Sequence, residues 1–146
     1  MTQVEFHFGA PDKIAYACRL LRKAVANGAH VAVIAPAATI TRLDAALWGT
    51  RAIDFVPHCL DAAPDSLLRH SPVVLGTQMQ TFPTLINPVL VQLCHPVAQS
   101  VHAYARVIEV VSLDEADRAE ARQRWKTYRA WGISIEKRDL ALKEMR

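Results

Sequence analysis

The run VAVIA at residues 31–35 decides the fold class of this chain. Every residue in it is apolar, and no polar residue interrupts the run. A strand that is covered on both faces has this continuous apolar pattern, which is typical of parallel sheets packed between helices. The run therefore predicts a buried strand of a parallel sheet.

The residues before this run predict first a strand and then a helix. Val4, Phe6 and Phe8 alternate with other residues as in a half-buried strand. Residues 12–27 then place apolar side chains on one helical stripe, and Gly28 ends that helix. The members of the stripe are Ile14, Cys18, Leu21 and Val25.

The segment after the run is a second amphipathic helix. Apolar residues recur at helical spacing up to Trp48, and Thr39 or Thr41 is the expected N-cap. Residues 54–58 are expected to be short and extended, and residues 59–71 to be a polar connection. Further strands are predicted at residues 73–76, 89–94 and 106–111.

Strands that alternate with helices imply βαβ crossovers, so the fold class is α/β with a mainly parallel sheet and helices on both faces. We expect a single domain over residues 1–146. Residues 133–146 are charged, and a short strand or helix there has only a weak sequence signal.

Residues 112–131, SLDEADRAEARQRWKTYRAW, form the best-marked helix. Ser112 and Glu115 are expected to make a capping box, and Gly132 to end the helix. At about 100° per residue, one arc of roughly 100° is basic and aromatic, which suits an anionic ligand. The arc contains Arg118, Arg122, Trp125, Lys126 and Arg129, whereas Leu113, Ala121, Tyr128 and Trp131 are expected to point toward a core.

Composition limits the function classes. The chain has 146 residues and a formal net charge of +3, which is modest for a protein that coats DNA. Its three cysteines are widely spaced and predict neither a disulfide framework nor a metal or redox motif. Neither a signal peptide nor an apolar run of membrane-spanning length is present. These features predict a cytoplasmic protein with no membrane partner.

Motifs for catalysis and cofactor binding are missing from the sequence. It contains neither a GxG pair nor a GxxxxGK[ST] loop, so no phosphate cradle is predicted. The histidines match no metal-binding pattern, and no serine or cysteine has the local signature of a nucleophile. We therefore expect no cofactor, no metal and no catalytic residue.

Two stretches resemble a known family. Residues 43–58, LDAALWGTRAIDFVPH, match an L-D-x-x-L-W segment followed by F-x-P-H. Residues 121–132, ARQRWKTYRAWG, match A-R-x-R-[YW]-K-x-Y-R-x-x-G. Both patterns are similar to those of the chi subunit of bacterial DNA polymerase III holoenzyme. The resemblance implies a three-layer Rossmann-like domain that lacks the nucleotide-binding glycine loop, and a non-catalytic accessory subunit of the clamp-loader complex in DNA replication.

The resemblance also implies binding residues. In the family, the late helix and the end of the preceding strand bind the acidic C-terminal tail of single-stranded-DNA-binding protein. The matching positions here are Val111, Arg118, Arg122, Trp125 and Lys126. Relatives often have Lys and Tyr where this chain has Arg118 and Trp125.

Trp48 and Phe55 match the family's surface for the psi subunit and, in some relatives, for an accessory helicase. Spacing alone favours packing of both rings in the chain's own core, whereas the resemblance favours an exposed interface. Whether the organism supplies a psi subunit stays open.

Two other functions also stay open at this point. One is direct nucleic-acid binding by the same basic helix, although the low net charge predicts only weak or indirect contact with DNA. The other is a small enzyme with an atypical nucleotide site at the carboxyl ends of the strands.

Overall fold

A computed structural model describes residues 1–49 and 55–140. Within these ranges the elements in chain order are β1 (Gln3–Ala10), α1 (Lys13–Ala26), β2 (Val31–Ile34), α2 (Ala37–Trp48), β3 (His58–Leu60), α3 (Asp65–His70), β4 (Val73–Gly76), β5 (Val89–Gln92), the 3₁₀ helix η2 (Gln99–Ala103), β6 (Arg106–Ser112), α4 (Glu115–Ala130) and β7 (Ser134–Asp139).

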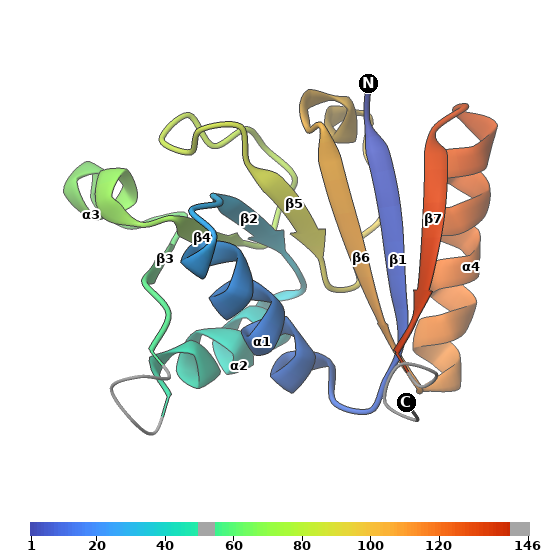
Figure 1. Cartoon of the computed structure of the whole chain (residues 1–146), viewed down its shortest axis with the longest axis horizontal. Helices are drawn as coiled ribbons and strands as arrows, with labels where there is room; N and C mark the ends of the chain where they lie inside the picture. Colours follow the sequence, from blue (N-terminus) through green and yellow to red (C-terminus); the bar gives the residue numbers. More distant parts are fainter. Residues whose placement is uncertain (50–54, 141–146) are drawn as a thin grey trace.

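The strands form one sheet in the order β3-β4-β2-β5-β6-β1-β7, and every strand pair is parallel (Figure 1). The α/β prediction with a parallel sheet is confirmed. In a parallel sheet all carboxyl ends lie at the same edge, so the loops that follow the strands meet there.

Helices cover both faces of the sheet and produce the three layers. The alternation of side chains along β2 sends Val31 and Val33 into the core beneath α1 and α2, and Ala32 and Ile34 into the core on the face of α4. All four side chains are buried. The apolar run at residues 31–35 therefore has the two-sided burial that its composition predicted.

The C-terminal segment continues the sheet. β7 pairs with β1 from Gln3↔Ser134 to Phe8↔Asp139 and forms the edge of the sheet beside α4 (Figure 1). The described part of residues 133–146 forms a strand over Ser134–Asp139, one of the two forms expected there, and residues 141–146 lie outside the described part. The weak signal has a physical cause, because an edge strand with mostly exposed charged side chains shows little apolar alternation.

Gly28 and Gly132 follow the ends of α1 and α4 with positive φ, as predicted, whereas the N-caps of α2 and α4 differ from those predicted. α2 begins after Pro36 with no side-chain cap, and the Thr41 hydroxyl instead donates to the Ala37 carbonyl inside the helix. The cap of α4 is Asp114, whose carboxylate accepts the Asp117 N–H at 3.1 Å. Ser112 is the last residue of β6, so the predicted Ser112–Glu115 capping box is wrong.

Three further predictions need correction. Leu113 is exposed and not directed to the core, because it lies in the turn before α4. The extended segment after α2 is β3, at residues 58–60, and of the predicted 54–58 the residue at 54 lies outside the described part. The connection expected at 59–71 contains both the end of β3 and α3. In the described residues, no helix is long and apolar enough to cross a bilayer.

Candidate functional site

A pocket of about 420 Å³ lies between α4 and the edge of the sheet. Four elements contribute to it: β1, β6, β7 and one face of α4. It is lined by Phe6, Phe8, Val111, Arg118, Ala121, Arg122, Trp125, Lys126 and Lys137. An apolar cavity with a few convergent polar groups is the usual form of a ligand site.

Aromatic rings form the floor of the pocket. The Trp125 ring lies 5.0 Å from that of Phe6, measured between centroids, with the planes tilted by 49°. The Lys137 ammonium lies 5.6 Å from the centroid of the Trp125 ring, within the range of a cation–π contact. Trp125 is partly buried, so part of its indole remains available to a ligand.

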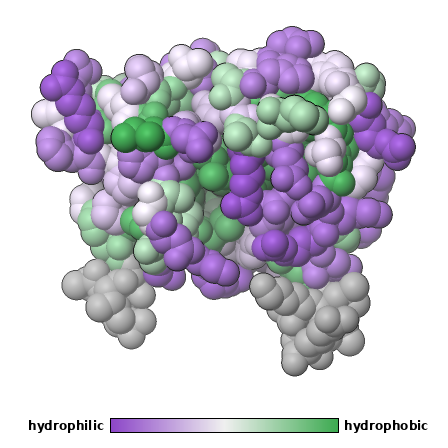
Figure 2. Space-filling model, turned by 45° about the horizontal axis from the view of Figure 1, so that its top comes forward, coloured by the Kyte–Doolittle hydropathy of each residue, from purple (hydrophilic) through white to green (hydrophobic). Residues whose placement is uncertain are grey.

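Cations surround this floor. Arg118, Arg122 and Lys126 are exposed on α4, and Lys137 is exposed on β7. Glu115 is the one carboxylate that an ion pair joins to them in the described residues, with contacts of 2.9 Å to Arg122 and 3.8 Å to Arg118. The hydrogen bond and charge of Arg122 lower the pKa of Glu115. The surface on the α4 and β7 side is mostly hydrophilic (right side of Figure 2).

The structure brings together five of the predicted residues, namely Val111, Arg118, Arg122, Trp125 and Lys126. Arg129, which belongs to the same predicted arc, is exposed but does not line the pocket. The arc therefore extends beyond the cavity at its C-terminal end.

Sequence reasoning missed Phe6, Phe8 and Lys137. The alternation of Val4, Phe6 and Phe8 does place these side chains on one face, but it does not show that α4 covers that face. Lys137 had no local signal, since it enters the pocket only through the pairing of β7 with β1, where it lies opposite Phe6.

A second exposed surface surrounds the end of α2. Trp48 is 61% exposed and Phe55 is 39% exposed, so the Trp48 ring is directed largely to solvent and neither residue belongs to the buried core. Their centroids lie 5.1 Å apart. His58 supports the pair from β3, with its ring 5.8 Å from Trp48 and its Nε2 2.7 Å from the Asp44 carboxylate.

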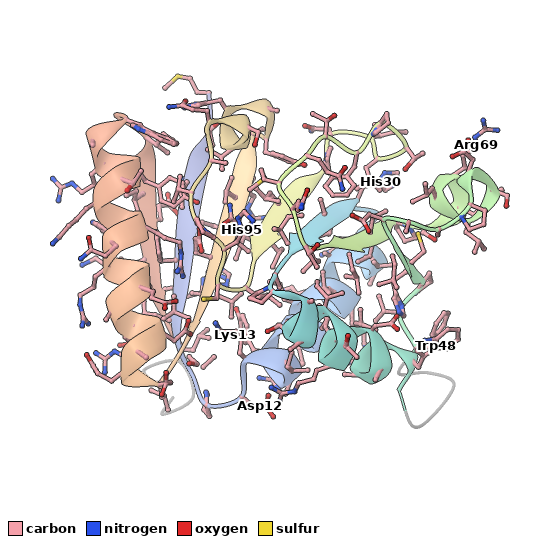
Figure 3. All side chains as sticks on the ribbon, turned by 180° about the vertical axis from the view of Figure 1, so that it is seen from behind. Asp12, Lys13, His30, Trp48, Arg69 and His95 are labelled. Carbon is pink, nitrogen blue, oxygen red and sulfur yellow. The ribbon has the colours of Figure 1, made fainter. Side chains whose placement is uncertain are left out.

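The two surfaces lie on opposite sides of the molecule. Trp48 contacts His58 of β3, which is one edge of the sheet, whereas Lys137 belongs to β7 at the other edge. Figure 3 shows Trp48 projecting at the end of α2, far from α4. Ligands at these surfaces would not compete for space.

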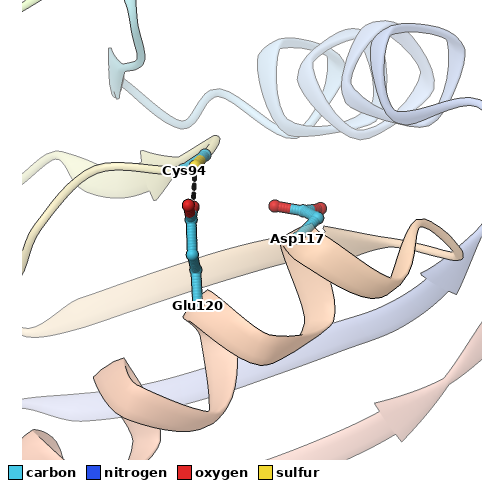
Figure 4. A group of neighbouring side chains, drawn as sticks. All are labelled: Cys94, Asp117 and Glu120. Atoms are coloured by element: carbon cyan, nitrogen blue, oxygen red, sulfur yellow. Dashed lines mark hydrogen bonds between the residues drawn. The ribbon is translucent and has the colours of Figure 1, made fainter.

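A third group of polar side chains lies near the carboxyl ends of the strands. Cys94, Asp117 and Glu120 place one ligand atom each within 4.8 Å of one another (Figure 4). The Cys94 thiol donates to Glu120 at 3.0 Å, and burial together with Glu120 raises the pKa of Cys94 to about 11. A thiol must be deprotonated to bind a metal, whereas the Cys94 thiol here keeps its proton and donates it to Glu120.

Asp117 of this group already bonds to two other residues. Its carboxylate accepts Lys13 at 2.7 Å and the Ser112 N–H at 2.8 Å. Burial alone would raise the pKa of Asp117, but these two bonds outweigh it and leave the pKa below its ordinary value. The Lys13–Asp117 pair also lines a polar cavity of about 410 Å³ at the carboxyl ends of the strands.

Comparison with known proteins now decides the family. The family model described as "DNA polymerase III chi subunit, HolC" matches residues 1–136. This chain belongs to the DNA polymerase III chi subunit family. The DNA polymerase III subunit chi of Pseudomonas aeruginosa is 31% identical to it over 141 residues, which cover 93% of this chain and 95% of that protein.

Membership of the chi family gives the chain a role in DNA replication as an accessory subunit of DNA polymerase III. Among solved structures, the C-terminal domain of S. cerevisiae Dbp5, bound to Gle1 and IP6, superposes with a TM-score of 0.53. That match covers 95% of this chain and 90% of the other at 13% identity, so it reports the shared fold alone.

Proposed function

We propose that this chi-family chain binds the acidic C-terminal tail of single-stranded-DNA-binding protein in the pocket between α4 and β7. Through Trp48 and Phe55 it binds the psi subunit of the clamp loader, or an accessory helicase where one is present. It thereby links coated single-stranded DNA to the polymerase holoenzyme and supplies no catalytic group of its own.

The observation that carries this proposal is the combination of an aromatic floor and a rim of cations in one cavity. An acidic peptide that ends in an aromatic residue presents a ring and a terminal carboxylate side by side. The ring suits Trp125 and Phe6, and the carboxylate suits Arg122 or Lys126, since hydrogen bonds between charged groups are the stronger ones.

The second surface supports the linking role. A Trp that is 61% exposed is unusual for a residue with only a packing function, and large aromatic residues are enriched at the energetic centres of interfaces. Because this surface lies at the edge of the sheet opposite the pocket, both partners can bind at once.

Calorimetry with a synthetic peptide that ends in acidic residues and Pro-Phe tests the tail site. Arg122→Ala and Lys126→Ala should each weaken binding roughly 10-fold, near the lower end of the ~1.5–3 kcal/mol of a charged hydrogen bond because both cations are exposed. A peptide without its last Phe should lose as much. Unchanged affinity in both variants would remove α4 from the binding site.

Direct nucleic-acid binding by α4 is the competing function, and the observation in its favour is the outward row of exposed cations. A labelled single-stranded oligonucleotide, titrated at the same salt concentration, distinguishes the two functions. We expect weak binding, because few phosphates can be neutralised by one short stripe. A submicromolar dissociation constant at physiological salt would favour the nucleic-acid function instead.

A further inference from the structure

The side of α4 toward the sheet carries polar residues beside the buried Ala121, with the exposed Glu120 at its margin. Asp117, Glu120, Arg124 and Tyr128 recur at spacings of three and four residues, which place them on one side of a helix. We call these four residues the inner stripe. Each of them hydrogen-bonds a partner outside the helix: Asp117 bonds Lys13 and Ser112, Glu120 bonds Cys94, and Arg124 and Tyr128 both bond Glu109.

The strongest part of this attachment surrounds Glu109, in the middle of β6. The Arg124 Nε donates to one carboxylate oxygen at 3.0 Å, and the Tyr128 hydroxyl donates to the other at 2.6 Å. Glu109 and Tyr128 are completely buried, and Arg124 is 6% exposed. Burial raises the pKa of Glu109, while Arg124 and Tyr128 act in the opposite direction.

Such a group is a poor source of net stability, because the loss of hydration offsets most of the attraction between buried charges. What distinguishes this group from apolar packing is that its hydrogen bonds depend on orientation. Apolar packing tolerates rotation of a helix about its axis, whereas hydrogen bonds weaken steeply with misalignment. The two donors of α4 meet two oxygens of a single carboxylate, so they fix how the helix is rotated on the sheet.

The rotation of α4 sets the geometry of the pocket. Trp125 directly follows Arg124, and Arg122 and Lys126 lie on the same side of the helix as Trp125. With a radius of ~5–6 Å including side chains, a rotation of about 20° would move these groups by ~2 Å, which is enough to break a hydrogen bond to a ligand.

We propose that Glu109, Arg124 and Tyr128 are positioning residues for the pocket, which fix the rotation of α4 so that Trp125, Arg122 and Lys126 face the ligand together. None of the three lines the pocket. This inference rests on the proposed function only for its effect on peptide binding, since the orientation of Trp125 is measurable without any ligand.

The test measures the stability of the fold and the exposure of Trp125 independently. In the full chain, Glu109→Met, Arg124→Met and Tyr128→Phe are combined, so that the buried pair is replaced by apolar residues of similar size. Such replacements are often neutral or stabilising. The variant also loses the long 3.5 Å bond from Gln92 to the Tyr128 hydroxyl, so the thermal midpoint should stay close to the wild-type value. Acrylamide quenching of Trp125 fluorescence should nevertheless increase at least 1.5-fold, measured with Trp48→Phe and Trp131→Phe present in both proteins.

The same triple variant, with its native Trp48 and Trp131, should bind the acidic Pro-Phe peptide at least 10-fold more weakly than the wild-type chain. If Trp125 quenching is unchanged in a folded triple variant, the positioning role is wrong whatever the peptide does. If the wild-type chain does not bind the peptide, the proposed function fails, and the quenching result alone still decides the positioning role.

A single substitution tests the same inference if the triple variant does not fold. Tyr128→Phe removes the 2.6 Å bond to Glu109 and the long 3.5 Å bond from Gln92, and it introduces no unpaired charge. It should therefore retain the fold and increase Trp125 quenching by a smaller factor. Thr127→Val is the matched control, because among the described residues its hydroxyl bonds only the Gln123 carbonyl of the same helix. Equal quenching in the Tyr128→Phe and Thr127→Val variants would overturn the inference.

Discussion

Replacing Lys137 by Gln removes a cation from the pocket, whereas replacing Arg129 by Gln removes one from the same surface outside the pocket. Both substitutions change the net charge by the same amount. If the site is a defined cavity, only the first should weaken binding of the acidic tail peptide. If binding depends on overall positive charge, as in nonspecific nucleic-acid contact, the two should have equal effects.

The size of the expected loss follows from the position of Lys137. Its contact with the Trp125 ring at 5.6 Å exists before the ligand arrives, so it adds little to binding. The Lys137→Gln variant loses one ion pair with a peptide carboxylate, in a site that is partly exposed to solvent. Exposed pairs contribute about 0.2–1 kcal/mol and charged hydrogen bonds ~1.5–3 kcal/mol, so about 1 kcal/mol, or roughly 5-fold in affinity, is expected.

Isothermal titration calorimetry of the wild-type chain and both variants at physiological salt measures these differences. Arg129→Gln should stay within about 1.5-fold of wild type, because a Debye length of ~8 Å screens exposed charges outside the cavity. Losses of equal size for the two variants would refute the pocket as the binding site.

Trp48→Ala should leave the thermal midpoint nearly unchanged but weaken binding of a psi or helicase partner by about 2 kcal/mol or more. A large loss of stability, measured by thermal unfolding, would show that Trp48 is a core residue instead. Glu115→Gln should strengthen peptide binding in calorimetry, because it frees Arg122 from an internal carboxylate, and weaker binding would contradict this competition. Burial, assisted by the nearby Arg138, lowers the pKa of His7 from 6.5 to about 4, so the unfolded chain takes up a proton in this range that the folded chain does not. The free energy of unfolding, measured in urea, should therefore fall as the pH falls from 6.5 to 4, and His7→Asn should remove this part of the pH dependence.

The sequence predicted the elements whose patterns are local. The apolar run at 31–35 and the helical stripes that flank it are read over a few residues, because each reflects the repeat of one strand or helix. The basic arc of α4 was predictable for the same reason. Caps were less predictable, since both Ser112 and Asp114 are good N-cap residues and only the end of β6 decides between them.

Only the tertiary structure decided what surrounds these elements. Sequence spacing favoured a buried Trp48, yet the fold leaves it 61% exposed at the edge of the molecule, because burial depends on what packs against a residue. Lys137 reaches the pocket through pairing between strands more than 120 residues apart in the chain, such as Gln3↔Ser134. Glu109 and Arg124 are near in the chain, but they meet only because α4 packs on β6. Local periodicity thus determined which residues share a face of an element, and packing between distant segments determined what each face meets.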